Sequence, residues 1–388
     1  MPDLPAPPSA GLSSDRFRAE FPALRDSVHL ASCSQGAASV RMTAALEEFQ
    51  WSIRSEGAPW PRWMAEVEAA RTAFAALINA APDEVAVVGC ASDGAFQVAS
   101  TQDWARRPGV VSTDMEFPSI GHVWLAQERA GARVRYVADD DGTVHADDYA
   151  AAIDDTTGLV SVPLVSYRNG LRMPVAEATA AARRHGARVF VDAYQAAGVI
   201  PIDVRELDCD YLVAGALKYL LGVPGVAFLY VRGGLADAVP PSLTGWFGRR
   251  DPFAFDPRGL DFADTARRFE TGTPAIPAVY AAAAGMATLA LAEPRAVDAH
   301  VAALVDACYD RLAADGRRLW SPKDPALRGP QVALVDDDPD ELAALLARRR
   351  IFVSPRGHVV RLSFHYYNDA ADIEAACRAI REVRGRRS

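Results

Sequence analysis

Residues 188–195 read Arg-Val-Phe-Val-Asp-Ala-Tyr-Gln, and residues 211–218 read Tyr-Leu-Val-Ala-Gly-Ala-Leu-Lys. Each stretch contains a short apolar run, which is typical of a buried β-strand. The first run ends at the carboxylate of Asp192, and the second leads to the amine of Lys218. Parallel sheets bind ligands at the carboxyl ends of their strands. We therefore expect these two charged groups to face one binding site.

A carboxylate and an amine at one sheet edge suit pyridoxal phosphate. The aldehyde of this cofactor forms a Schiff base with a lysine, and its ring nitrogen pairs with an aspartate. In this interpretation Asp192 keeps the ring nitrogen protonated, and Lys218 is the catalytic residue that holds the aldehyde and then moves protons at Cα. Taken singly, Asp192 is also compatible with a helix cap and Lys218 with a surface lysine. Their joint arrangement predicts pyridoxal 5'-phosphate as the cofactor.

Composition narrows the class of protein. The 388 residues, half of them hydrophobic, can bury a large core and predict one large and one small domain. The formal net charge of -9 argues against nucleic acid or an anionic membrane as a partner. Five widely spaced cysteines without a C-x-x-C pair predict no disulfide framework and no metal site, and they favour a reducing cytoplasm. Because no apolar run reaches about 18 residues, we expect a soluble protein.

The spacing Asp192-x-x-Gln195 followed by Lys218 resembles the cofactor core of the class V aminotransferase family of fold type I pyridoxal phosphate enzymes. This family includes cysteine desulfurases, kynureninase and isopenicillin N epimerase. The resemblance extends, with gaps, from residue 27 to residue 367. It implies an α/β fold in which a mainly parallel, seven-stranded sheet lies between helices and is joined to a small α+β C-terminal domain. It also implies that Gln195 hydrogen-bonds the phenolic oxygen of the cofactor.

Four segments follow from this resemblance and from the pattern of the chain. Residues 1–26 are expected to be a flexible tail, because the first 14 are rich in Pro, Ala and Ser. Residues 27–80 form an N-terminal segment that packs near the small domain. Residues 81–293 form the large cofactor-binding domain. Residues 294–388 alternate helices and strands and form the small C-terminal domain.

The phosphate site is predicted where an apolar strand at residues 85–89 leads into Cys-Ala-Ser-Asp-Gly at residues 90–94. A helix that starts there offers free backbone N–H groups and the positive end of its dipole. Ala91 and Ser92 match the family's phosphate-binding turn, with an ordinary helix cap as the alternative. One departure concerns the lysine motif. Desulfurase-like relatives read Ser-Gly-His-Lys, where residues 215–218 read Gly-Ala-Leu-Lys, so two phosphate ligands of those relatives are missing.

Three further cofactor contacts are implied by the resemblance. Phe117 follows the strand at residues 110–113 and is expected to stack on the pyridine ring. Many family members carry His at this point, and Phe cannot act as an acid or base. Trp246 lies in a Gly-Trp motif that is assigned to the cofactor site. Thr273 lies in Arg-Phe-Glu-Thr-Gly-Thr-Pro and is expected to reach the phosphate of a neighbouring subunit, which implies a homodimer.

The substrate contacts are predicted around an arginine. Arg361 matches the family's carboxylate-binding arginine, whose fork pairs a carboxylate through two parallel hydrogen bonds. Tyr167 or Arg168 matches a position that faces the phenolic oxygen and the substrate carboxylate. Gln35 lies in the opening segment, which approaches the substrate in the family. Core packing for Phe117, a solvated charge for Arg168 and a structural ion pair for Arg361 are the alternatives.

We predict an enzyme that acts on an α-amino acid, and transamination is the first choice because it needs only Lys218. A lyase that eliminates or cleaves a β-substituent is second, since Phe117-Pro-Ser resembles the kynureninase branch, and an epimerase is third. Desulfuration through a protein persulfide is disfavoured, because residues 354–361 contain no cysteine. No G-x-G-x-x-G motif follows a strand, which argues against a nicotinamide dehydrogenase. A catalytically inactive relative that serves as a binding protein is the non-enzyme alternative.

Overall fold

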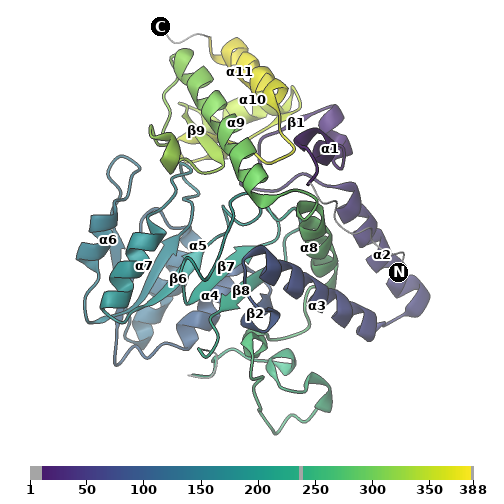
Figure 1. The fold of residues 1–388 in the computed structure, drawn as a ribbon, viewed down its shortest axis with the longest axis vertical. Helices are drawn as coiled ribbons and strands as arrows, with labels where there is room; N and C mark the ends of the chain where they lie inside the picture. Colours follow the sequence, from purple (N-terminus) through teal and green to yellow (C-terminus); the bar gives the residue numbers. More distant parts are fainter. Residues whose placement is uncertain (1–10, 236–238, 386–388) are drawn as a thin grey trace.

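The computed structural model describes residues 11–235 and 239–385, and a seven-stranded sheet lies at its centre (Figure 1). The strand order is β2-β8-β7-β6-β5-β3-β4. Strand β8 runs antiparallel to both of its neighbours, and every other pairing in this sheet is parallel. The predicted α/β fold with a mainly parallel sheet is therefore confirmed. The strands are β2 (Val85–Val88), β3 (Gly109–Thr113), β4 (Arg133–Val137), β5 (Thr157–Pro163), β6 (Arg188–Asp192), β7 (Tyr211–Gly215) and β8 (Ala227–Val231).

Helices cover both faces of this sheet, because successive side chains of a strand point to opposite faces. In β6, Phe190 joins the core beneath α4 and α5, whereas Val189 and Val191 join the core on the other face. Burial on both faces explains why the strands read as continuous apolar runs. The covering helices are α4 (Ala91–Ser100) and α5 (Pro118–Ala126) on one face, and α3 (Trp60–Leu77), α6 (Ala146–Ala152), α7 (Val175–Arg184) and α8 (Ile276–Leu289) on the other.

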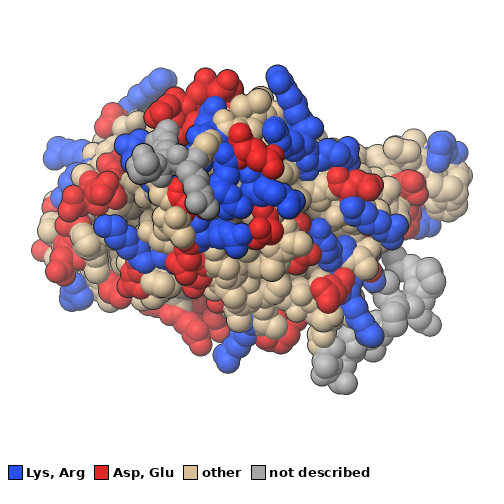
Figure 2. Space-filling view, turned by 90° about the horizontal axis from the view of Figure 1, so that it is seen from above, with Lys and Arg blue, Asp and Glu red and all other residues tan. Residues whose placement is uncertain are grey.

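The small domain lies at the top of Figure 1 and is built on an antiparallel sheet in the order β11-β12-β9. Seen from above, its basic and acidic side chains lie intermingled (Figure 2). The long helix α9 connects this domain to the large one. Its elements are α9 (Pro294–Ala314), β9 (Gln331–Val335), α10 (Pro339–Ala347), β10 (Ile351–Phe352), β11 (Ser354–Arg356), β12 (Val359–Ser363) and α11 (Ala370–Arg384).

The start of the chain is packed against the small domain. Helix α1 (Ser14–Arg18) buries Phe17, whose ring centroid lies 5.3 Å from that of Tyr366, and Phe21 lies 4.7 Å from Tyr367. The prediction of a flexible tail over residues 1–26 is therefore wrong for residues 11–26. Two buried aromatic rings outweigh the Pro- and Ala-rich composition that suggested it. Residues 1–10 lie outside the described part of the chain.

The next segment joins both domains. Strand β1 (Val28–His29) pairs in parallel with β10 of the small domain. Helix α2 (Val40–Glu56) and helix α3 pack against α8 of the large domain. Residues 27–80 therefore contact the small domain only through their first part. Short 3-10 helices span Pro22–Arg25, Pro82–Glu84, Gln127–Ala130, Trp246–Gly248, Pro252–Ala254, Ala266–Phe269 and Pro325–Leu327.

No single helix of the described chain is long and apolar enough to cross a bilayer. Helices α8 and α9 reach the required length and composition only as a pair, and they meet at an angle of 86°.

Candidate active site

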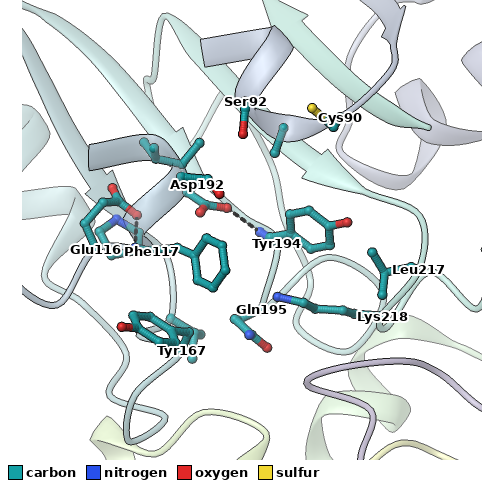
Figure 3. A pocket seen from close by; sticks show the side chains of 15 residues that line it. Cys90, Ser92, Glu116, Phe117, Tyr167, Asp192, Tyr194, Gln195, Leu217 and Lys218 are labelled. Atoms are coloured by element: carbon teal, nitrogen blue, oxygen red, sulfur yellow. Dashed lines mark hydrogen bonds between the residues drawn. The ribbon is translucent and has the colours of Figure 1, made fainter. Parts of the chain in front are cut away.

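A cavity of about 240 Å³ lies at the carboxyl edge of the central sheet (Figure 3). Its walls come from the start of α4 and from the segments that follow β3, β5, β6 and β7, so one sheet edge supplies nearly all of them. The prediction that Asp192 and Lys218 face one site is confirmed by this lining. The lining residues are Cys90, Ala91, Ser92, Glu116, Phe117, Ser119, Ile120, Pro163, Val165, Tyr167, Asp192, Tyr194, Gln195, Leu217 and Lys218.

The amine of Lys218 lies between two aromatic rings. Its Nζ is 4.3 Å from the ring centroid of Tyr194 and 5.4 Å from that of Phe117. Burial lowers the pKa of Lys218 from 10.5 to about 8, against the opposing effect of the Asp192 charge. A larger share of this amine is therefore neutral near pH 7 than is usual for a lysine. A neutral amine can act as a nucleophile and can accept a proton.

The loop that follows this lysine is held from the small domain. The Nε2 of His365 lies 3.1 Å from the carbonyl oxygen of Tyr219, and its Nδ1 accepts a hydrogen bond of 2.8 Å from the backbone of Tyr366. Burial lowers the pKa of His365 to about 4, so the ring is neutral and its Nε2–H is the donor. His365 could not be identified from local sequence patterns, because its imidazole binds a backbone carbonyl of a loop far away along the chain.

Asp192 is fixed by its own turn. Its Oδ1 accepts a hydrogen bond of 2.8 Å from the backbone N–H of Tyr194. Burial raises the pKa of Asp192, while that hydrogen bond and the charge of Lys218 lower it. Gln195 donates from Nε2 to the carbonyl oxygen of Cys33 at 3.2 Å, and its buried Oε1 has no partner among the described residues. One end of this amide is therefore free for a ligand in the cavity.

Glu116 is a second buried carboxyl group in the cavity, and the sequence analysis missed it. Its Oε1 accepts a hydrogen bond of 2.8 Å from the backbone N–H of Phe117, and Ser161 donates to its Oε2 at 3.1 Å. Burial, and after it the charge of Asp192, raises the pKa of Glu116 well above its ordinary value. Glu116 therefore keeps its proton to a higher pH than an ordinary carboxyl group does. Its position directly after β3 was the available signal.

The other end of the cavity is formed by the first turn of α4. Cys90 precedes this helix, and Ala91 and Ser92 line the cavity. The first N–H groups of a helix have no partner within it, and they face an anion favourably together with the helix dipole. Lys218 is the one lysine or arginine among the lining residues within the described chain. Neutral donors must therefore provide most of the contacts to a phosphate at this end.

Comparison with known proteins identifies the family. The model of the family described as aminotransferase class V matches residues 52–376. The chain belongs to this family. It is 40% identical over 364 residues to the uncharacterized aminotransferase YcbU of Bacillus subtilis (strain 168), covering 93% of this chain and 96% of that protein. It is therefore a pyridoxal phosphate-dependent enzyme of the class V type.

Two other relatives show how broad the class V family is. A kynureninase of Deinococcus radiodurans is 32% identical over 276 residues, which cover 67% of this chain and 64% of that protein. The apo structure of a cysteine desulfurase from Thermococcus onnurineus NA1 superimposes with a TM-score of 0.86 at 23% identity, covering 96% of this chain and 99% of that one. The fold is therefore shared across class V enzymes with different named activities.

The residues of the cavity fit the cofactor. Asp192 offers a carboxylate for the ring nitrogen, Gln195 offers a free amide end, and α4 offers backbone donors for the phosphate. Lys218 is the amine of the cavity that would take the aldehyde. When bound, the cofactor supplies an electron-withdrawing ring to the substrate's Cα.

The predicted substrate contacts divide between the cavity and its surroundings. Tyr167 lines the cavity, and its ring meets that of Phe117 edge to face at 5.0 Å. Arg168 does not line it, because its guanidinium lies 5.0 Å from the ring centroid of Trp320 and 3.7 Å from Asp139. Of the two alternatives, only Tyr167 reaches the site. A contact between Arg168 and the substrate stays a prediction.

Arg361 and Gln35 lie behind the cavity wall. Arg361 is buried, and it donates to the carbonyl oxygen of Tyr167 at 2.9 Å and to Ser354 Oγ at 2.7 Å. Gln35 donates to the carbonyl oxygen of Gly222 at 3.0 Å. Neither residue lines the cavity within the described chain. Arg361 is nevertheless near enough for its charge to help lower the pKa of Lys218.

Trp246 and Thr273 lie outside this cavity. Trp246 packs in an aromatic cluster, with its ring centroid 4.3 Å from that of Phe247 and 5.6 Å from that of Trp60. Trp246 does not line the cavity of a single chain, and its assignment to the cofactor site stays a prediction. Thr273 is exposed, and its contact with the phosphate of a neighbouring subunit stays a prediction.

Proposed function

We propose that the protein is an aminotransferase for an α-amino acid, in which Lys218 moves a proton between the substrate's Cα and C4′ of the cofactor. The supporting observation is that Lys218 is the single amine of the cavity, and no histidine lines it within the described chain. Phe117 stands where many relatives have His and cannot exchange a proton. Transamination needs one proton-transferring group at this position, and Lys218 provides it.

The pKa of Lys218 supports this role. A general base works best when its pKa lies near the working pH, and that of Lys218 lies at about 8. Asp192 then keeps a negative charge opposite the ring nitrogen, which favours the protonated, electron-withdrawing ring.

Product analysis tests the proposed reaction. The purified protein with pyridoxal phosphate is incubated with a panel of amino acids, with and without a 2-oxo acid acceptor. We expect the amino group to appear on the acceptor, and no product beyond a single turnover without it. Ammonia and pyruvate released in the absence of an acceptor would reject transamination.

A lyase is the second candidate. The 32% identity to a kynureninase, together with the turn of Phe117 and Pro118 after β3, favours it. In the same experiment a lyase would release the β-substituent of S-substituted cysteines or of similar substrates without an acceptor. The persulfide route stays disfavoured, since β11 and β12 pair directly, with only residues 357–358 between Arg356 and Val359, and neither is a cysteine.

We also propose that Arg361 binds the substrate's α-carboxylate. Arg361 is buried and matches the family's carboxylate-binding arginine, and it donates a hydrogen bond to the backbone carbonyl of Tyr167, which lines the cavity. An Arg361→Lys variant keeps the charge but loses the planar fork. It is expected to raise KM for the amino acid by about 10-fold or more, the range for a charge-assisted hydrogen bond. An unchanged KM would reject this role.

We propose further that a second subunit completes the phosphate site. The cavity carries little positive charge of its own, and Thr273 is exposed. Near Trp246 the surface displays Phe253, Phe255 and Leu260, with exposed fractions of 47%, 70% and 57%. Apolar groups gathered at the surface in this way are typical of a protein interface.

Mixing two inactive variants tests this arrangement. If Thr273 serves the neighbouring site, a dimer of one Lys218→Ala chain and one Thr273→Ala chain contains one intact site. We expect each variant alone to be impaired and the mixture, after refolding or subunit exchange, to regain activity. A monomer in light scattering, or a mixture no more active than its parts, would contradict the proposal.

A further inference from the structure

The phosphate end of the cavity lacks the side-chain donors that the lysine motif supplies in desulfurase-like relatives. Residues 215–217 read Gly-Ala-Leu and carry no hydroxyl or imidazole. A phosphate group has strong acceptor oxygens and negative charge, so it needs donors. A hydroxyl at this end must therefore come from another segment of the chain.

Tyr194 occupies the space that a side chain at residue 215 would need. A Cβ atom added to Gly215 would lie 2.1 Å from both Cζ and Oη of Tyr194. A side chain at residue 215 would fit only if the phenol of Tyr194 moved away. Gly215 does not have a positive φ, so its backbone does not require glycine. Room for the phenol of Tyr194 is therefore the reason for glycine at this position.

The hydroxyl of Tyr194 is free to bind a ligand. Within the described chain, the residue's hydrogen bond is made by its backbone N–H to Asp192, and its Oη has no protein partner. Tyr194 lines the cavity together with Cys90, Ala91 and Ser92, and the labelled side chains show its hydroxyl on the side of Cys90, away from Asp192 (Figure 3). The phenol hydroxyl therefore lies against Gly215 at the end of β7 and within electrostatic reach of Cys90, the residue that precedes α4.

The electrostatics favour a neutral donor at this position. Burial raises the pKa of Tyr194 above its ordinary value, and the charges of Asp192 and Cys90 raise it further. The phenol thus keeps its proton at neutral pH. A protonated hydroxyl beside the N–H groups at a helix start is suited to an anion.

We propose that Tyr194 is a phosphate-binding residue of this enzyme, which donates its hydroxyl to the cofactor phosphate beside the first turn of α4, and that Gly215 makes room for it. The inference rests on the pyridoxal phosphate cofactor and not on the reaction that the enzyme catalyses. Tyr194 also covers the Lys218 amine with its ring, so the two roles must be separated by experiment.

The first test compares pyridoxal phosphate with pyridoxal, which lacks the phosphate. Their affinities for the cofactor-free full chain are measured by absorbance titration. Tyr194→Phe keeps the ring above Lys218 and removes only the hydroxyl. We expect it to weaken pyridoxal phosphate binding by about 10- to 100-fold, the range for a hydrogen bond to a charged group, and to change pyridoxal binding by about twofold or less.

A matched control is Tyr167→Phe, which removes a hydroxyl from another wall of the same cavity. It should change the two affinities by the same factor. Equal losses for both compounds in Tyr194→Phe, or no loss, would overturn the proposal. A wild-type chain that binds both compounds equally well would contradict it too, whereas failure to bind either compound would defeat the cofactor assignment itself.

The second test exchanges the two residues. Gly215→Ser alone should collide with Tyr194 and lower both the melting temperature and cofactor affinity. Tyr194→Ala alone should lose the hydroxyl. In the double variant, a serine hydroxyl at residue 215 enters the space that the phenol leaves. We expect its preference for pyridoxal phosphate over pyridoxal to recover by about 10-fold relative to Tyr194→Ala. A double variant no better than the worse single variant would contradict the spatial exchange.

Discussion

Buried charges are arranged differently in the core and in the cavity. In the core, the Nη1 of Arg71 lies 2.6 Å from Oε1 of Glu270, which also accepts a hydrogen bond of 2.9 Å from the backbone of Val87. In the cavity, Glu116, Asp192 and Lys218 make no ion pair within 4 Å to any described residue, although all three face the same space.

This difference separates charges that hold the fold from charges that act on a ligand. A buried charge is costly unless it is paired. The core pair compensates its charges within the protein. In the cavity, a proton neutralises Glu116, and a bound cofactor and substrate compensate the charges of Asp192 and Lys218.

The largest effect is expected from replacing the core acid. Glu270→Gln keeps the shape of the side chain but removes the buried partner of Arg71, whose guanidinium keeps the exposed Glu68 as an ion-pair partner at 3.0 Å. We therefore expect a cost of about 3 kcal/mol, the low end of the range for breaking a buried ion pair. Glu116 is as buried as Glu270, at 5% exposure each, but is already neutral. Glu116→Gln is therefore expected to change the free energy of unfolding by about 1 kcal/mol or less. Urea unfolding of the cofactor-free chain measures both.

Glu116→Gln also serves as the control for the core variant, because both substitutions replace a buried carboxyl group by an amide. Infrared spectroscopy of the same samples should show a protonated carboxylic acid at neutral pH that is lost in Glu116→Gln and kept in Glu270→Gln. Equal destabilisation by the two substitutions would show that Glu116 is charged and paired in the wild-type protein. The proposed difference between the core and the cavity would then be wrong.

A smaller loss is expected from Asp192→Asn. The amide cannot keep a negative charge opposite the ring nitrogen, so the ring withdraws electrons less strongly. We expect kcat/KM to fall by about 10- to 100-fold, the range for one charge-assisted hydrogen bond. The free energy of unfolding of the cofactor-free chain should stay the same or rise, because a buried carboxylate without an ion pair is removed. An Asp192→Asn variant that folds stably and keeps the wild-type kcat/KM would contradict the role assigned to Asp192.

The smallest change is a shift in pH dependence. The rate at which the cofactor-free chain captures pyridoxal phosphate should rise with pH, with a midpoint near pH 8, because the neutral amine of Lys218 reacts and its pKa lies at about 8. The folded chain releases this proton near pH 8 and the unfolded chain near 10.5, so the contribution of Lys218 to stability rises over that interval.

Asp192→Asn should move this midpoint to lower pH, because the charge of Asp192 raises the pKa of Lys218. Stopped-flow absorbance measures the capture rate. A midpoint near 10.5 in the wild-type chain would show that the amine is not desolvated.

The sequence predicted the parts of the fold and site that depend on local pattern. Apolar runs gave the strands of the central sheet, and Asp192 and Lys218 could be placed because each directly follows such a run. Glu116 and Tyr194 escaped notice because their roles depend on neighbours in other strands. Burial, and after it the charge of Asp192, raises the pKa of Glu116, and Tyr194 is placed by the absence of a side chain at residue 215.

Composition and motifs did not predict where segments pack against residues far away along the chain. Pro and Ala near the start of the chain suggested a tail, yet Phe17 is fully buried against the small domain. Trp246 was assigned to the cofactor from its motif, and in the structure it packs with other aromatic rings. Neither result could be read from local spacing, because both depend on residues far away along the chain.

The central claim is that Lys218 carries the cofactor as a covalent adduct. The most direct measurement is borohydride reduction of the purified full chain loaded with pyridoxal phosphate, followed by peptide mapping with mass spectrometry. We predict a pyridoxyl group on Lys218 and none in the Lys218→Ala variant. An adduct on another lysine, or a chain that takes up no cofactor, would contradict the claim.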